Sequence, residues 1–173
     1  MISFDEVAEQ SRASINKDDL KVLLPILAKI NPRCILEIGM HRGYSMEVWR
    51  KAFDPKILIG LEKDPPTPDS YSEAGFMWEI DSHKVNAQNI TPMPVDFLFI
   101  DGDHSEAGVR QDFDTFFPIV REGGIVVFHD VCYTSPDPNA PVMVRPLWEE
   151  LKLKYPYLEI RTKGSTGMGV IWK

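Results

Sequence analysis

Three things are scarce in this sequence: cysteine, basic charge and long apolar runs. The two cysteines, Cys34 and Cys132, are too few for a disulfide framework or a cysteine metal cluster. The net charge of −7 argues against a nucleic acid or an anionic membrane as partner. No apolar run approaches the roughly 20 residues of a membrane span, and MISFDEVAEQ lacks the pattern of a signal peptide. These absences predict a cytoplasmic protein that binds neither nucleic acid nor membrane.

The bulk composition predicts one globular domain over residues 1–173. Charged residues make up 26% and hydrophobic residues 43%, and 173 residues suffice for a substantial core. Residues 1–30 predict N-terminal helices with a break near Asn16, and leucines recur along one face of the second helix. We expect these helices to cover the sheet or the pocket.

The central stretch runs from Arg33 to Ser45 and is written RCILEIGMHRGYS. Its apolar first half, ending at Ile38, predicts a buried parallel strand. Gly39 and Gly43 then bracket a tight turn, and residues 44–53 predict a helix. A strand, a glycine turn and a helix form the first unit of a nucleotide-type α/β fold, because the backbone can pass close to a ligand there.

Strands and helices alternate along the rest of the chain. The break in this rhythm comes at the end, where two strands follow each other directly. The pattern predicts an α/β fold, Rossmann-like and doubly wound, with a mostly parallel seven-stranded sheet and a C-terminal antiparallel hairpin. The further strands are expected at 56–61, 76–80, 95–100, 125–128, 157–162 and 169–172, the main helices at 105–120 and 144–154, a short helix at 83–89, and loops at 64–72 and 131–141.

Polar side chains stand at the end of each of the first five strands. They are Glu37, Glu62, Asp81, Asp101, and His129 with Asp130. The carboxyl ends of parallel strands form one rim of a sheet, where ligands bind. Loops are polar in any protein, so one such residue alone would mean little, but the regular recurrence favours a site.

The glycine turn and the acids near it limit the classes of ligand that fit the site. Glu62 lies about 20 residues beyond the glycines, the interval expected for an acid that binds ribose hydroxyls. Gly-x-x-x-Gly is not the dinucleotide pattern, and the acidic Glu37 beside the turn disfavours a pyrophosphate. A cationic nucleoside without phosphate, such as S-adenosylmethionine, suits these residues better.

Four segments resemble class I S-adenosylmethionine-dependent methyltransferases: EIGMHRGYS, GLEKD, VDFLFIDGDHSEAGVRQDF and GGIVVFHDV. The likeness is greatest to the small group that includes cephalosporin hydroxylase-like and macrolide sugar O-methyltransferases. It covers about residues 33–131, and the terminal hairpin also fits.

The resemblance implies roles for the cofactor-binding positions. Glu37, Gly39 and Gly43 match the motif that holds the methionine end, with Ser45 near its carboxylate. Glu62 matches the ribose acid. The remaining positions are Asp81 with Ser82, which match the adenine-binding pair, and Asp101, the acid after the fourth strand.

The resemblance also implies a divalent metal, magnesium or manganese, at Asp101, His129 and Asp130. Relatives with a firm magnesium site have oxygen ligands at both later positions, whereas this chain has a histidine at one. Imidazole suits manganese, iron, nickel or zinc better than magnesium. His104 is an alternative ligand to His129. In a second interpretation one of the two histidines is a general base, and in a third His129 only lines the wall.

The predicted activity is therefore O-methylation of a small hydroxylated acceptor, with Asp101, His104 and His129 as catalytic candidates. Few residues are left to form a lid, which favours an open pocket or a homodimer. Two alternatives remain: a cofactor-binding module without catalysis, and a nicotinamide-dependent oxidoreductase, which the glycine spacing and the hairpin disfavour.

Overall fold

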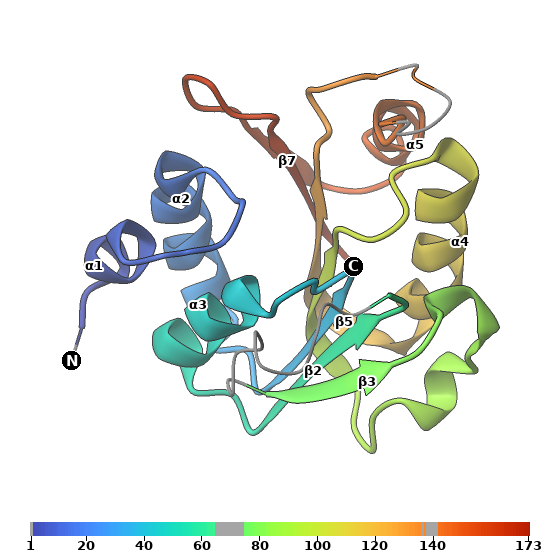
Figure 1. Cartoon of the computed structure of the whole chain (residues 1–173), viewed down its shortest axis with the longest axis horizontal. Helices are drawn as coiled ribbons and strands as arrows, with labels where there is room; N and C mark the ends of the chain where they lie inside the picture. Colours follow the sequence, from blue (N-terminus) through green and yellow to red (C-terminus); the bar gives the residue numbers. More distant parts are fainter. Residues whose placement is uncertain (1, 65–74, 136, 138–141) are drawn as a thin grey trace.

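A seven-stranded sheet forms the centre of the computed structural model, which describes residues 2–64, 75–135, 137 and 142–173 (Figure 1). The strand order is β3-β2-β1-β4-β5-β7-β6. Strands β1 to β5 are parallel, and β7 is antiparallel to both β5 and β6. The predicted fold is confirmed. The strands are β1 (Cys34–Ile38), β2 (Ile57–Glu62), β3 (Phe76–Glu79), β4 (Val95–Ile100), β5 (Val120–His129), β6 (Tyr157–Ile160) and β7 (Met168–Trp172).

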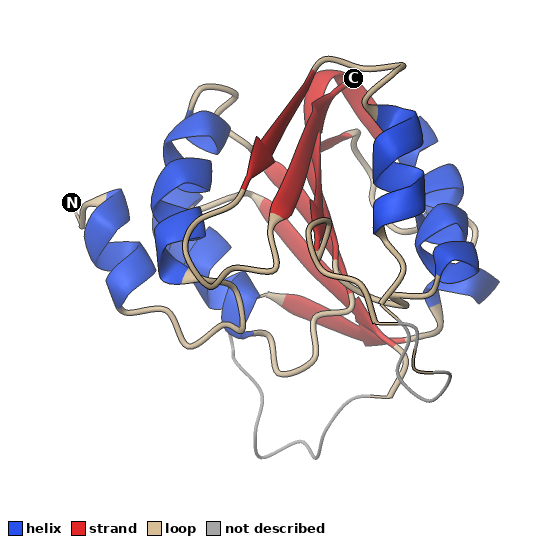
Figure 2. Cartoon of the chain, turned by 90° about the horizontal axis from the view of Figure 1, so that it is seen from above, coloured by secondary structure: helices blue, strands red, loops and turns tan. Residues whose placement is uncertain are grey.

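Helices cover both faces of the sheet (Figure 2). On one face lie α1 (Phe4–Glu9), α2 (Lys17–Ala28) and α3 (Tyr44–Phe53), and on the other α4 (Glu106–Phe116) and α5 (Arg145–Leu151). Successive strand residues point to opposite faces, so β1 contributes Leu36 to one apolar core and Ile35 to the other. Burial on both faces explains why the central strands are continuous apolar runs.

Local sequence determines where α2 begins. The Asn16 side chain accepts hydrogen bonds from the backbone N–H groups of Asp18 and Asp19, which caps the helix at the expected break. The helix contains Pro25 and continues to Ala28. Within the described ranges, no helix is both long and apolar enough to cross a membrane.

Several element boundaries differ from those expected. Helix α4 ends at Phe116, and Phe117–Ile119 form a 3₁₀ turn (η4) containing Pro118, which lacks the N–H that a continuing helix needs. Strand β5 runs from Val120 to His129 and includes Gly123 and Gly124, which precede the strand expected at 125–128. The short helix expected at 83–89 is instead two 3₁₀ turns, η2 (Ser82–Lys84) and η3 (Ala87–Asn89).

Strand β3 is an edge strand, and its aromatic residues are partly open to solvent. Phe76 is 68% exposed and Trp78 is 40% exposed. Within the described residues, β3 pairs with β2 alone. Of the loop expected at 64–72, residues 65–72 lie outside the described part of the chain.

Candidate active site

The turn after β1 lies directly against the end of β4. Gly39 has φ +80°, and a Cβ added to it would lie 2.2 Å from the Asp101 carbonyl oxygen. Gly43, with φ +72°, precedes the first residue of α3. Only glycine fits at position 39, because any side chain would collide with the backbone of β4. The two predicted glycines therefore bring the turn and Asp101 together.

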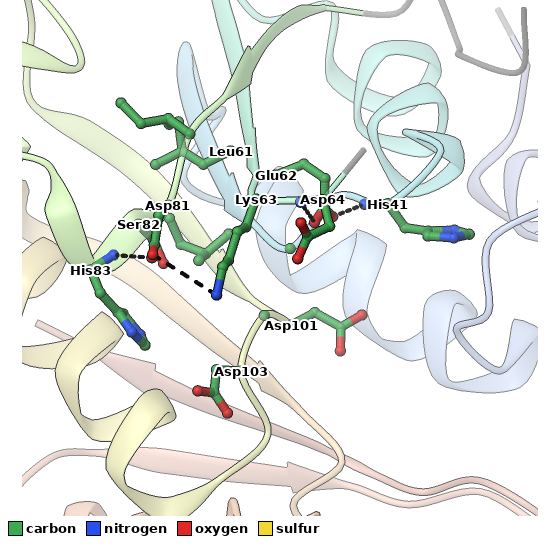
Figure 3. A pocket seen from close by; sticks show the side chains of 14 residues that line it. His41, Leu61, Glu62, Lys63, Asp64, Asp81, Ser82, His83, Asp101 and Asp103 are labelled. Atoms are coloured by element: carbon green, nitrogen blue, oxygen red, sulfur yellow. Dashed lines mark hydrogen bonds and ion pairs between the residues drawn. The ribbon is translucent and has the colours of Figure 1, made fainter. Parts of the chain in front are cut away.

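A cavity of about 310 Å³ opens where β1, β2, β3 and β4 end (Figure 3). Five of the predicted cofactor residues line it: Gly39, Glu62, Asp81, Ser82 and Asp101. They come from four different strand ends, as expected for the carboxyl rim of a parallel sheet.

Glu62 lines this cavity, and hydrogen bonds hold both of its carboxylate oxygens in place. Oε2 accepts the His41 backbone N–H at 2.7 Å, and Oε1 accepts that of Asp64 at 3.2 Å (Figure 3). The His41 ring itself points away from Glu62 (Figure 3). Each carboxylate oxygen can still accept a second hydrogen bond, so the group suits a ligand with two adjacent hydroxyls.

Asp81 forms the far end of the cavity. Its Oδ1 accepts the His83 backbone N–H at 3.1 Å, and its Oδ2 lies 4.0 Å from the Lys63 ammonium (Figure 3). The Lys84 ammonium lies closer to Oδ2, at 3.2 Å. The His83 hydrogen bond, with help from Lys84, lowers the pKa of Asp81. The carboxylate therefore stays ionised and can only accept hydrogen bonds.

Glu37 and Ser45 lie beneath the glycine turn. The Glu37 side chain is buried and accepts hydrogen bonds from the Ser45 hydroxyl and, at 2.8 Å, from Trp49 Nε1. Glu37 is not among the residues that line the main cavity or the smaller hollow beside Ser45. Ser45 lines a smaller hollow of about 50 Å³ that shares Gly39, His41 and Asp101 with the main cavity and also touches residues 13–15.

Asp101 belongs to a cluster of two histidines and two carboxylates. The other members are His104, His129 and Asp130. Asp101 Oδ1 lies 3.0 Å from His104 Nε2 and 3.1 Å from His129 Nδ1. Asp130 approaches both rings, with Oδ2 3.7 Å from His104 Nε2 and Oδ1 3.3 Å from His129 Nδ1. Asp130 has φ +62°, an uncommon conformation for a residue other than glycine. The structure thus joins the ends of β4 and β5 as predicted.

The cluster shifts the pKa of its members. Burial alone would raise the pKa of Asp101, but the hydrogen bonds from His104 and His129 outweigh it and lower the pKa. Burial alone would lower the pKa of His129, but Asp101 and Asp130 raise it to about 9. The hydrogen bond to Asp101 also raises the pKa of His104. Each pair therefore favours its charged form.

The donor atoms of this cluster fit a divalent metal. Asp101, His104 and Asp130 each offer a ligand atom, and these atoms lie within 4.8 Å of one another. This set contains His104, the alternative ligand expected from the sequence, in place of His129. Two oxygens and one imidazole nitrogen suit manganese, iron or zinc better than magnesium.

Asp112 and His83 were assigned no role from the sequence, yet they lie beside the cavity. Asp112 is buried and accepts a hydrogen bond from the Ser82 hydroxyl at 2.7 Å. A signal existed: on a helix, Asp112 falls on the same face as Val109, Phe113 and Phe116, which face the core. A carboxylate on an apolar helix face indicates a buried polar partner.

The fold and the cavity define an α/β domain with an acid-lined cavity at the carboxyl ends of its parallel strands. A family of sequences described as methyltransferase domain matches residues 36–131, and the chain belongs to this family. The family predicted from the sequence motifs is therefore confirmed.

Individual proteins show the same likeness. An uncharacterized protein of Acanthamoeba polyphaga mimivirus is 46% identical over 110 residues, and the match covers 55% of this chain and 50% of that protein. The chain thus spans about half the length of this curated relative. MycE of the mycinamycin biosynthetic pathway superposes with a TM-score of 0.72 at 18% identity, over 99% of this chain and 54% of that chain. The O-methyltransferase TomG from Streptomyces achromogenes gives 0.70 at 22%, over 99% and 91%. At these identities the two structures establish a shared fold.

Proposed function

We propose that this chain transfers a methyl group from S-adenosylmethionine to a hydroxyl oxygen of a small acceptor. The observation that carries the proposal is the cavity in which Glu62 faces the Gly39 turn, because it offers a diol acceptor and no phosphate-binding pattern. The family supports methyl transfer. The MycE structure holds Mg, S-adenosylhomocysteine and mycinamycin VI, and the TomG structure holds S-adenosylmethionine.

The strand order supports one orientation of the cofactor along the rim of the sheet. Because β1, β2 and β3 are neighbours in the sheet, their ends form a row. In our proposal Gly39, Gly43 and Ser45 hold the methionine end, Glu62 binds the ribose hydroxyls, and Asp81 with Ser82 binds adenine. Glu37 acts through Ser45 and Trp49, which it holds beneath the turn.

The acceptor hydroxyl would then lie near Asp101, where the two hollows meet. When bound, the cofactor supplies the methyl group, and a divalent ion would lower the pKa of the acceptor hydroxyl. His104 is the better-placed base: its Nε2 contacts Asp101 and its side chain is 31% exposed, against 10% for His129. With Nε2–H donated to Asp101, the neutral ring would accept the proton at Nδ1, and the raised pKa of His104 favours holding it there. If a metal is present, Asp101, His104 and Asp130 would hold it, and His129 would orient Asp101.

Three further points belong to the proposal. The acceptor is a small hydroxylated molecule, the protein works in the cytoplasm, and a homodimer would supply cover for the acceptor side. The acid-lined rim supports a cationic cofactor over NADH, whose pyrophosphate would face Glu62, Asp81 and Asp101.

Calorimetric titration with S-adenosylhomocysteine, with NADH as the comparison and with added magnesium or manganese, tests the proposal. We expect binding of the first ligand only. Turnover on a panel of hydroxylated acceptors should then fall about 100-fold in Asp101→Asn, while Asp114→Asn on the exposed side of α4 leaves it unchanged. Binding of NADH alone would contradict the proposal. Binding of S-adenosylhomocysteine without turnover on any acceptor would favour a module without catalysis.

A further inference from the structure

A buried carboxylate lies behind the adenine end of the cavity. Asp112 on α4 has 0% of its surface exposed. Its Oδ1 accepts the Ser82 hydroxyl hydrogen at 2.7 Å. Its Oδ2 has no hydrogen-bond partner within the described part of the chain, and neither has His83 Nε2, which lies 3.3 Å from Oδ1 outside hydrogen-bonding geometry. Burying a carboxylate oxygen that has no hydrogen-bond partner costs free energy. We therefore infer that Asp112 has a functional role.

Three neighbours of Asp112 belong to the cavity wall. Ser82 and His83 line the cavity at the end of β3, and Gly102 lines it at the end of β4. The His83 ring extends toward α4 (Figure 3). A Cβ added to Gly102 would lie 3.3 Å from Asp112 Oδ2. Asp112 therefore supports the wall from behind, between two strand ends.

The hydrogen bond to Ser82 determines what that hydroxyl offers a ligand. Burial raises the pKa of Asp112 to about 6, so the carboxyl is ionised at pH 7.5 and can only accept. The Ser82 hydroxyl must then donate to Asp112, and its oxygen is left as an acceptor. Asp81, next along the chain, is also an acceptor. This end of the cavity therefore favours a ligand group that donates.

We propose that Asp112 is a positioning residue that makes the cofactor site selective for the adenine 6-amino group over a 6-oxo group. The proposal rests on the proposed function, because it assigns the base to the end of β3. The 6-amino group of adenine donates hydrogen bonds, whereas the 6-oxo group of hypoxanthine accepts them. Without Asp112, the Ser82 hydroxyl can rotate and donate, and the distinction weakens.

Affinities for S-adenosylhomocysteine and S-inosylhomocysteine, measured by calorimetry at pH 7.5, test this. We expect the wild-type protein to prefer the adenine compound, and Asp112→Ala to reduce that preference roughly tenfold. Asp112→Asn should retain most of it, because the amide oxygen can still accept from Ser82. Asp114→Asn, an exposed acid two residues along α4, is the matched control and should retain it fully.

Ser82→Ala provides an independent arm should Asp112→Ala fail to fold. Its preference should also fall, and the double variant should lose no more than either single one, since both act on one contact. Equal weakening of both ligands, with the ratio preserved in Asp112→Ala and in Ser82→Ala, would overturn the proposal. A wild-type protein that binds the two ligands equally would overturn it while leaving the proposed function intact. Failure to bind either ligand would instead remove the proposed function, and this proposal with it.

Discussion

At the scale of single residues, Glu37 is the most unusual group in the molecule. It is 1% exposed on β1, and its oxygens accept hydrogen bonds from the Ser45 hydroxyl and from Trp49. Burial raises the pKa of Glu37 to about 8, although both hydrogen bonds oppose the shift. An acid that is easier to protonate in the folded state links folding to pH.

The free energy of unfolding should therefore depend on pH through Glu37. The folded pKa of about 8 exceeds the ordinary value of 4.5, so the folded state binds the proton more tightly. Its contribution to stability is complete below about pH 4.5 and is lost as pH rises toward 8. Urea unfolding at about pH 5 and about pH 8.5 should show Glu37→Gln losing less stability over this interval than wild type, by about 3 kcal/mol.

Glu79→Gln, an exposed acid on β3, serves as the control and should follow the wild-type pH dependence. Parallel curves for wild type and Glu37→Gln would show that Glu37 titrates near its ordinary pKa in the folded protein.

Which residues meet at the rim could be predicted, but not how each side chain points. Glu62, Asp81 and Asp101 follow buried strands, and parallel strands end at one edge, so their convergence follows from topology. Glu37 lies within its strand, where alternate side chains face opposite sides, and it turns toward Trp49. The candidate metal set contains His104 in place of His129. The position of His104 depends on the geometry of the loop after β4, and loops have no periodic sequence pattern from which that geometry could be predicted.

At the scale of elements, α2 is tied to the hairpin between β6 and β7. Asp19 is 1% exposed and accepts the Thr162 backbone N–H at 2.9 Å as well as the Ser165 hydroxyl. Asn16, the cap of α2, accepts the Thr162 hydroxyl at 3.1 Å. Residues far apart in sequence are thus joined by hydrogen bonds to one helix end.

Removing this tie should cost stability. Asp19→Ala leaves the Thr162 N–H and the Ser165 hydroxyl without their acceptor, so we expect a loss of about 2 kcal/mol in urea unfolding. Asp18→Ala removes the neighbouring exposed acid, which pairs with Lys21 at 3.0 Å, and should cost about 0.5 kcal/mol. Equal effects of the two substitutions would mean that Asp19 acts only through the helix dipole.

The elements that the sequence predicted best are those with the clearest burial. Strand β4 and helix α3 have their expected bounds, because an apolar run and an amphipathic repeat are strong local signals. The start of β5 was missed, since Arg121 to Gly124 carry charge and glycine, and Arg121 is held by an ion pair with Asp96 of β4. Exposed ends of strands depend on neighbouring strands, which local pattern does not contain.

At the scale of the whole molecule, the net charge is −7, and acidic residues also outnumber basic ones in the lining of the cavity. Glu62, Asp64, Asp81, Asp101 and Asp103 all line it, with Lys63 as a cation among them. A cleft lined with one sign of charge attracts ligands of the opposite sign. S-adenosylmethionine carries a sulfonium charge that S-adenosylhomocysteine lacks.

The preference for the charged ligand should therefore weaken with salt. We expect the ratio of the two dissociation constants to move toward one as the salt concentration rises from about 0.02 M to about 0.5 M. Competition calorimetry measures both constants under the same conditions, and the neutral ligand is the internal control. A ratio that does not change with salt would mean that the acids of the rim do not act on the sulfonium.

The close approach of Gly39 to the Asp101 carbonyl fixes the distance between two backbone segments of the cavity wall. Backbone atoms alone set the thickness of this wall, because a Cβ at position 39 would already collide. Directed evolution toward bulkier acceptors will therefore find no tolerated change here. Variation will accumulate instead in residues 13–15, which border the smaller hollow, and in the segment after Asp130. In the proposed reaction, the spacing between the methyl donor and the acceptor hydroxyl would stay constant among variants. The part of the pocket that fits the rest of the acceptor would be free to change.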